Sequence, residues 1–156
     1  MDESTYIALC EEHLAAFHRM ACSILHHQAD AEDAVQQALM KAWRLRGKAR
    51  PGLEKAWVMR IVINESISLL RRRRRALPTE EIRIPAAQVS GEETALHTAI
   101  RTLPESLRTP LLLKYMEGMT EKEVAAALQL SLTAVKNRLF RARRALQKQL
   151  NEEVSP

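Results

Sequence analysis

The stretch Thr120-Glu-Lys-Glu-Val-Ala-Ala-Ala-Leu-Gln-Leu-Ser-Leu-Thr-Ala-Val-Lys-Asn-Arg-Leu139 decides the fold of the C-terminal part of this chain. Its apolar residues are spaced as in a helix-turn-helix, in which two helices pack across a short turn. The inward positions of such a motif are Val124, Ala125, Leu128, Leu130 and Val135. Ser131 or Thr133 can cap the second helix through its hydroxyl oxygen. We therefore predict helices over residues 120–128 and 133–150.

The second of these helices has two contrasting faces. The apolar face consists of Val135, Leu139, Ala142 and Leu146. The polar and basic residues that lie opposite or flank it are Thr133, Lys136, Asn137, Arg138, Arg141 and Arg144. Arginine can bind guanine through two hydrogen bonds, asparagine can bind adenine, and lysine and arginine can also bind phosphates. This face is predicted to read DNA in a major groove; the alternative is an ordinary helical hairpin with a solvated basic face.

Gln129 stands in the turn of this motif. Many motifs of this kind have glycine there, because the turn needs a left-handed backbone. A residue with a Cβ atom destabilises that conformation by about 1 kcal/mol. We expect the fold to tolerate this cost.

Two further helices precede the motif. A helical pattern over residues 92–103 is stopped by Pro104, and a second over residues 105–116 ends at Gly118. Together with the motif they complete a four-helix module. We assign this second domain to residues 94–156.

The N-terminal part of the chain predicts three helices, over residues 5–25, 30–44 and 53–75. The acidic run at the start of the second of them predicts an N-cap at Asp30 and an acidic first turn. Its inward face is Ala31, Val35, Ala38 and Ala42. Glycine, proline and protruding bases then predict a short basic loop over residues 46–52.

These three helices form a first domain, which we assign to residues 1–75. Residues 76–93 contain two prolines and one glycine and show no sustained periodicity. Such a segment is typical of a flexible linker between domains.

The helix over residues 53–75 carries a second functional signal. Its apolar side is Val58, Met59, Val62, Ile63, Ser66, Leu69 and Leu70. The other side consists of Trp57, Arg60, Ile61, Asn64, Ser68 and Arg71 and leads into five consecutive arginines, residues 71–75. This composition predicts contact with nucleic acid, with Trp57 and Ile61 available to stack against unpaired bases. The alternative is a packed Trp57 and a solvated basic tail.

The composition favours an all-α fold of two small helical domains joined by the linker. The chain has 156 residues, 46% of them hydrophobic, and only four glycines and six prolines. Its charge is uneven: residues 1–40 contain seven acids and one base, whereas residues 41–75 contain twelve bases and two acids. Because a basic zone attracts phosphates and an acidic zone does not, this split suggests two different partners.

Two cysteines, Cys10 and Cys22, fit neither a disulfide framework nor a CxxC motif, which predicts the reducing cytoplasm. His13 and His18 lie on the same predicted helix, but the four side chains span more than three turns, too far for one zinc ion. We predict no metal and no cofactor. No signal peptide begins the sequence and no apolar run approaches about 18 residues, so we expect no export and no membrane insertion.

The motifs resemble a known family when they are taken in order. They are Asp30-Ala-Glu-Asp-Ala-Val-Gln36, Trp57-Val-Met-Arg-Ile-Val-Ile-Asn64, the arginine run, a linker, and Leu103-Pro-Glu-Ser-Leu-Arg108 before the helix-turn-helix. This arrangement resembles the extracytoplasmic-function (ECF) group of sigma-70-type factors. The resemblance implies a promoter-melting first domain and a promoter-anchoring second domain, with no catalytic residues. It also implies three partners: core RNA polymerase, through its β′ clamp helices and β flap, promoter DNA, and an anti-sigma factor.

The resemblance also suggests which residues meet these partners. Those expected at the polymerase are Asp30, Glu32, Asp33, Gln36 and Gln37, the last standing where the family often has Glu. Those expected at the minus-ten element are Arg46, Lys48, Arg50, Trp57, Arg60, Ile61, Asn64, Ser68 and Arg71. Ser68 stands where the family commonly has Asp. Those expected at the minus-thirty-five element are Thr133, Lys136, Asn137, Arg138, Arg141 and Arg144.

Two other classes of function compete with this interpretation. An autonomous helix-turn-helix repressor or activator would explain residues 94–150 but not the acidic helix or the Trp57 side, and independence from polymerase would identify it. A nuclease or recombinase would need clustered metal-binding carboxylates, or a nucleophile among convergent positive charges. The acids at 30–33 are more simply explained as a helix start, so no enzyme is predicted.

Overall fold

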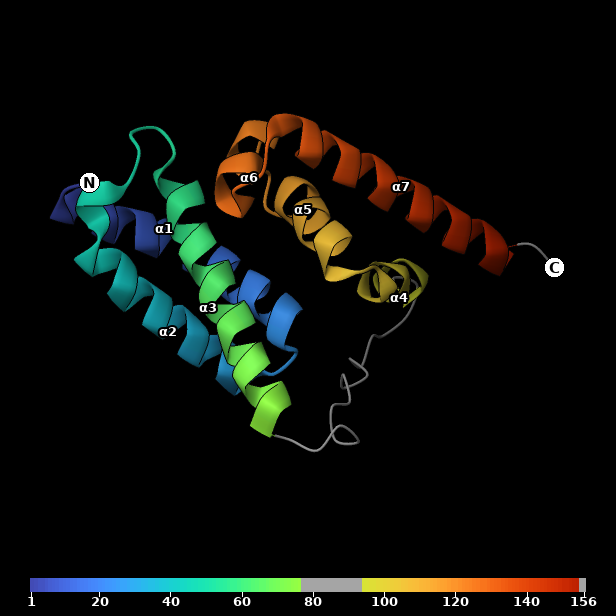
Figure 1. Ribbon diagram of the computed structural model, residues 1–156, viewed down its shortest axis with the longest axis horizontal. Coiled ribbons are helices and arrows are strands. Elements are labelled where there is room, and N and C mark those ends of the chain that lie inside the picture. Colours follow the sequence, from blue (N-terminus) through green and yellow to red (C-terminus); the bar gives the residue numbers. More distant parts are fainter. Residues whose placement is uncertain (77–93, 155–156) are drawn as a thin grey trace. The chain divides into compact units, whose positions relative to one another are not determined.

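The computed structural model describes residues 1–76 and 94–154, and every element within these ranges is a helix. The chain divides into two compact units (Figure 1). The first contains α1 (Glu3–Leu25), α2 (Gln28–Arg44), a short 3-10 turn η1 (Arg46–Lys48) and α3 (Glu54–Ala76). The second contains α4 (Thr94–Thr102), α5 (Glu105–Tyr115), α7 (Leu132–Val154) and the start of α6 (Glu121–Leu128). The predicted all-α fold is confirmed. Of the linker predicted over 76–93, Ala76 is the last residue of α3, and the rest lies outside the described residues.

The first unit is a three-helix bundle in which each helix packs against the other two. The predicted inward face of α2 is buried along its whole length, because Ala31, Val35, Ala38 and Ala42 are at most 2% exposed. Such small side chains let neighbouring helices approach closely. Phe17 of α1 and Met59 of α3 fill the space between them and are fully buried. A Phe17→Ala cavity would destabilise this bundle by about 3–5 kcal/mol.

The start of α2 differs from the prediction. Its N-cap is His27, whose Nδ1 accepts a hydrogen bond from the amide of Asp30 at 3.2 Å. The prediction that Asp30 caps this helix was therefore wrong, because the helix begins at Gln28 and Asp30 already lies in its first turn. The acidic first turn itself is confirmed.

The second unit is built around α7, which packs against α4 and α5. The predicted apolar face of α7 is confirmed at Val135, Leu139 and Ala142, which are fully buried. Arg108 of α5 is 9% exposed, and its Nη1 donates to two carbonyls at the end of α4, each at 3.2 Å. A cation is favourable there because the carbonyl end of a helix carries partial negative charge. Arg108 therefore connects the end of α4 to α5.

The helix-turn-helix has well-defined caps at both of its helices. Thr120 and Glu123 form a reciprocal capping box at the start of α6, with both hydrogen bonds at 3.1 Å. Glu121 accepts a hydrogen bond from Lys114 of α5 at 2.8 Å, which lowers the pKa of the Glu121 carboxyl. Ser131, one of the two predicted caps, accepts from the amide of Ala134 at 3.1 Å at the start of α7. Lys114 thus joins α5 to α6, and Ser131 defines the start of α7.

Gln129 occupies the left-handed backbone region with φ of 55°, as its place in the turn predicts. Gln129→Gly should raise the free energy of unfolding by about 1 kcal/mol, because glycine has no Cβ atom to disfavour this conformation. Gln129→Ala is the control, since it removes the same side chain but keeps the Cβ atom. Urea unfolding of both variants tests this, and equal midpoints would show that the backbone is not strained at this turn.

Candidate functional surfaces

The N-terminal half of α2 presents a polar and acidic surface. Its exposed side chains are Glu32, Asp33, Gln36 and Gln37. Asp30 does not belong to this surface: its side chain is 5% exposed, and its carboxylate accepts a hydrogen bond from Arg73 of α3. Four of the five residues predicted to meet a polymerase are therefore accessible on one surface, whereas Asp30 is buried.

An apolar groove continues this surface along α2, and the sequence reasoning missed it. It has a volume of about 410 Å³ and is lined by Tyr6, Gln36, Leu39, Met40, Trp43 and Arg44. The rings of Tyr6 and Trp43 lie 5.4 Å apart, and the Tyr6 hydroxyl donates to the Leu39 carbonyl. Burial raises the pKa of this hydroxyl well above its usual range. Met40 is 58% exposed. A helical wheel could have predicted this, because Met40 is an apolar residue that lies outside the inward face of α2.

The basic segment over residues 46–52 is more ordered than predicted. Residues 46–48 form the 3-10 turn η1, and the Arg46 guanidinium lies 3.8 Å from the centre of the Trp43 ring. Arg46 also donates to the Trp43 carbonyl at 2.8 Å. Lys48 and Arg50 are exposed. Two of the three predicted DNA contacts in this segment are thus fully accessible, whereas Arg46 is anchored on α2.

The outward side of α3 departs from the prediction at one residue. Asn64, Ser68 and Arg71 are exposed, and Trp57 and Arg60 are half-buried. Ile61 is only 8% exposed, so the prediction that it can stack against bases was wrong. The buried residues of α3 extend past the predicted apolar stripe to Ala56 and Ile61. A polar and basic strip with one accessible indole remains.

The polar and basic face of α7, which lies opposite its apolar face, is exposed as the sequence pattern predicted. Thr133, Lys136, Asn137, Arg141 and Arg144 are all exposed. Arg138 is half-buried, and its guanidinium donates to the Ser106 carbonyl at 3.4 Å, which limits its reach toward a ligand. Phe140 was missed: it is 52% exposed, and the Arg144 guanidinium lies 5.7 Å from its ring.

Two family models together match most of this chain. The family model for sigma-70 region 2 matches residues 9–76, and that for sigma-70 region 4 matches residues 93–146. The RNA polymerase sigma-H factor of Pseudomonas aeruginosa is 31% identical over 146 residues, covering 81% of this chain and 76% of that protein. This chain belongs to the ECF group of the sigma-70 family. Its region 2 corresponds to α1–α3 and its region 4 to α4–α7.

Other proteins are similar to this sigma factor in sequence and in structure. ECF RNA polymerase sigma factor SigE of Mycolicibacterium smegmatis is 30% identical over 94% of this chain, which spans 62% of the length of SigE. Among solved structures, the sigma factor RpoE of Bartonella quintana, in complex with the anti-sigma factor NepR, has a TM-score of 0.72. It is 30% identical, with 91% of this chain and 94% of that chain covered. CnrH in complex with the cytosolic domain of CnrY has a TM-score of 0.71 at 28% identity, covering 97% of this chain and 90% of that chain.

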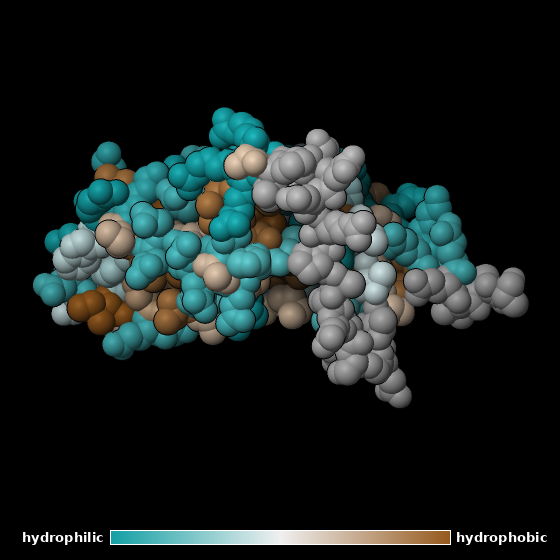
Figure 2. Space-filling view, turned by 90° about the horizontal axis from the view of Figure 1, so that it is seen from below, coloured by the Kyte–Doolittle hydropathy of each residue, from teal (hydrophilic) through white to brown (hydrophobic). Residues whose placement is uncertain are grey.

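Burial raises the pKa of the Cys10 and Cys22 thiols, which keeps them protonated at neutral pH. Within residues 1–76 and 94–154, no three His, Cys, Asp or Glu side chains come together as metal ligands, and no helix could cross a membrane. On the face shown in Figure 2, hydrophobic residues gather in separate small patches among hydrophilic ones.

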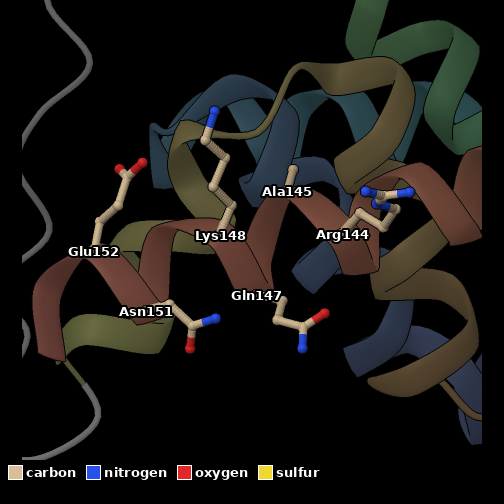
Figure 3. Close-up of a pocket in the computed structure, with 6 residues that line it drawn as sticks. All are labelled: Arg144, Ala145, Gln147, Lys148, Asn151 and Glu152. Atoms are coloured by element: carbon tan, nitrogen blue, oxygen red, sulfur yellow. The ribbon is translucent and has the colours of Figure 1, made fainter. Parts of the chain in front are cut away.

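A shallow hollow of about 650 Å³ lies along the C-terminal half of α7 (Figure 3). It is lined by Arg144, Ala145, Gln147, Lys148, Asn151 and Glu152. All six residues belong to one helix, and Lys148 and Gln147 point to opposite sides of it. A hollow of this kind is the surface of a helix and holds no convergent set of polar groups.

Proposed function

We propose that this sigma factor binds core RNA polymerase and directs promoter recognition, strand opening and the start of transcription. The observation that carries the proposal is the pairing, in one chain, of an exposed acidic helix surface with two separate basic surfaces, on α3 and α7. The region 2 and region 4 matches support it. Polymerase supplies the catalysis, so this chain needs no catalytic residues of its own.

Docking is assigned to the acidic surface of α2. Glu32, Asp33, Gln36 and Gln37 offer carboxylate and amide groups along one helix, which suits a basic and polar partner such as the β′ clamp helices. The β flap is the proposed partner of region 4. When both regions are bound to one polymerase, two weak DNA-binding modules act together through their effective concentration. Promoter specificity then depends on both elements and on their spacing.

Strand opening is assigned to α3 and the segment before it. Opening breaks base stacking, and binding of the separated strand offsets part of that free energy. The half-buried Trp57, with exposed Asn64, Ser68 and Arg71, offers stacking, hydrogen bonding and charge to a single strand. Lys48 and Arg50 add positive charge beside it. We assign these residues to the minus-ten element and the exposed face of α7 to the minus-thirty-five element.

An anti-sigma factor is the proposed regulator. Both solved relatives described above are in complex with another protein, NepR for RpoE and CnrY for CnrH. A partner that covers the α2 surface or its apolar groove would compete with core polymerase. We propose the cytoplasm as the compartment, because the polymerase acts there.

Run-off transcription tests the proposed function directly. Purified core polymerase should produce defined transcripts from genomic promoter fragments only when this protein is added. An autonomous regulator would instead protect its DNA site from nuclease digestion with no polymerase present, and would leave core polymerase inactive at these promoters. The two outcomes are mutually exclusive on the same fragments.

Substitution on the outward side of α3 should separate polymerase binding from strand opening. Trp57→Ala and Asn64→Ala should bind core polymerase as the natural protein does, yet lower the permanganate reactivity of promoter thymines by about fivefold or more, since stacking contributes about 1–3 kcal/mol per base. Trp57→Phe keeps an aromatic ring and should retain most of the opening. Normal opening by both alanine variants would make this side of α3 purely structural.

A further inference from the structure

Asp30 has surroundings that differ from those of a docking residue. Its side chain is 5% exposed, Oδ1 accepts a hydrogen bond from Arg73 Nη2, and Oδ2 lies 3.5 Å from His27 Nδ1. A buried carboxylate is unfavourable unless it is paired with a cation or a hydrogen-bond donor. Arg73 supplies such a partner from within the chain. The conformation of Asp30 is therefore explained without a polymerase.

Arg73 is set apart from the other arginines by helix geometry. It follows Ser66 by seven residues, about two turns, and so lies on the buried side of α3. Arg71 and Arg75 follow Asn64 by seven and eleven residues and lie on its exposed side. Within the run, Arg73 is thus the arginine bonded to α2, and Arg72 lines a hollow with Asp33 and Gln37 of that helix. Arg71 and Arg75 continue the strip proposed to meet DNA.

The end of α3 needs an anchor to keep this arrangement. All six residues from 71 to 76 are exposed, so no apolar side chain holds the last turn against the bundle. Like charges three or four positions apart also destabilise a helix, and helix ends open readily. The bond between Asp30 and Arg73 links the first turn of α2 to this last part of α3.

We propose that Asp30 is a positioning residue for DNA and not a contact for polymerase. By holding Arg73, it keeps the end of α3 helical and directs Arg71 and Arg75 along the same side as Asn64 and Ser68. The first acid of the docking motif would then serve strand opening, while Glu32 and Asp33 serve docking. This inference rests on the proposed sigma activity for its functional part.

The test compares Asp30→Asn and Arg73→Met, singly and combined, in the full-length protein. Each variant is titrated against core polymerase, and the rate of promoter opening is then measured with saturating variant. Each single variant should bind core polymerase within about twofold of the natural protein but open promoters about tenfold more slowly, with the combined variant no slower than either. Arg73→Lys should restore most of the rate. Asp33→Asn should behave in the opposite way, with weaker binding and normal opening at saturation.

Arg74→Met is the matched control, because it removes the same charge from an exposed position. Its effect on opening should add to that of Asp30→Asn, since the two residues are not partners. Additive effects of Asp30→Asn and Arg73→Met would overturn the inference, as would a loss of core binding by Asp30→Asn equal to that of Asp33→Asn.

Hydrogen exchange of the isolated protein separates this inference from the proposed function. Asp30→Asn and Arg73→Met should each speed amide exchange at residues 71–76 by about tenfold and leave residues 58–66 protected. If the natural protein fails to open promoters with core polymerase but this change appears, the sigma activity is refuted and the anchor stands. Unchanged exchange at 71–76 in both variants would refute the anchor.

Discussion

Glu32→Lys combined with Asp33→Lys is expected to weaken binding to core RNA polymerase by at least about a hundredfold. The double substitution reverses the charge of both exposed acids in the N-terminal half of α2. Close charge pairs across a protein interface contribute about 1.5–7 kcal/mol, and the reversal turns attraction into repulsion. The fold should survive, because both side chains are exposed and substitutions at exposed positions usually change stability by no more than about 0.5 kcal/mol. Asp30 is kept unchanged, since its carboxylate is internal.

The matched control is Glu11→Lys with Glu12→Lys, which makes the same change in net charge at two exposed positions on α1. Competition with a labelled housekeeping sigma factor for core polymerase measures both variants. The control should lose no more than about threefold, through long-range electrostatics alone. A folded α2 variant that competes as well as the natural protein would remove this surface from the polymerase interface.

Replacement of Arg141 or Asn137 by alanine is expected to weaken binding to the upstream promoter element by about 1–3 kcal/mol and to relax base preference at one position. Both side chains are exposed near the middle of the recognition face, where base edges come within reach. Lys136→Ala should instead weaken all sites alike and reduce the slope of affinity against salt by about one unit, because a phosphate contact carries no sequence information.

Arg138→Ala should have the smallest effect of the four on DNA, because its guanidinium is directed to the Ser106 carbonyl. Holoenzymes carrying each variant can be titrated against single-base variants of the upstream element at two salt concentrations. If all four substitutions left both the base preference and the salt slope unchanged, residues 133–144 would not be the recognition helix.

Local patterns in the sequence were sufficient for the fold. The apolar periodicity located every α-helix in the described residues, because burial of one face of a helix is encoded by neighbours three and four residues apart. It did not predict the short 3-10 turn η1. The same argument placed the exposed face of α7, including Asn137 and Arg141, and the left-handed turn at Gln129 followed from its position between two helices. The order of the motifs also sufficed for the family.

Only the tertiary structure decided which polar residues remain available to a partner. Asp30 and Ile61 both belong to patterns that predict exposure, yet Asp30 meets an arginine 43 residues away and Ile61 is only 8% exposed. Arg138 of α7 likewise donates to the carbonyl of Ser106 in α5. Helical periodicity describes the faces of one helix at a time. Burial and ion pairing depend also on which side chains of a second helix pack against that face. That is why the sequence alone determined the helices and their faces, and why packing determined which charges are free to bind.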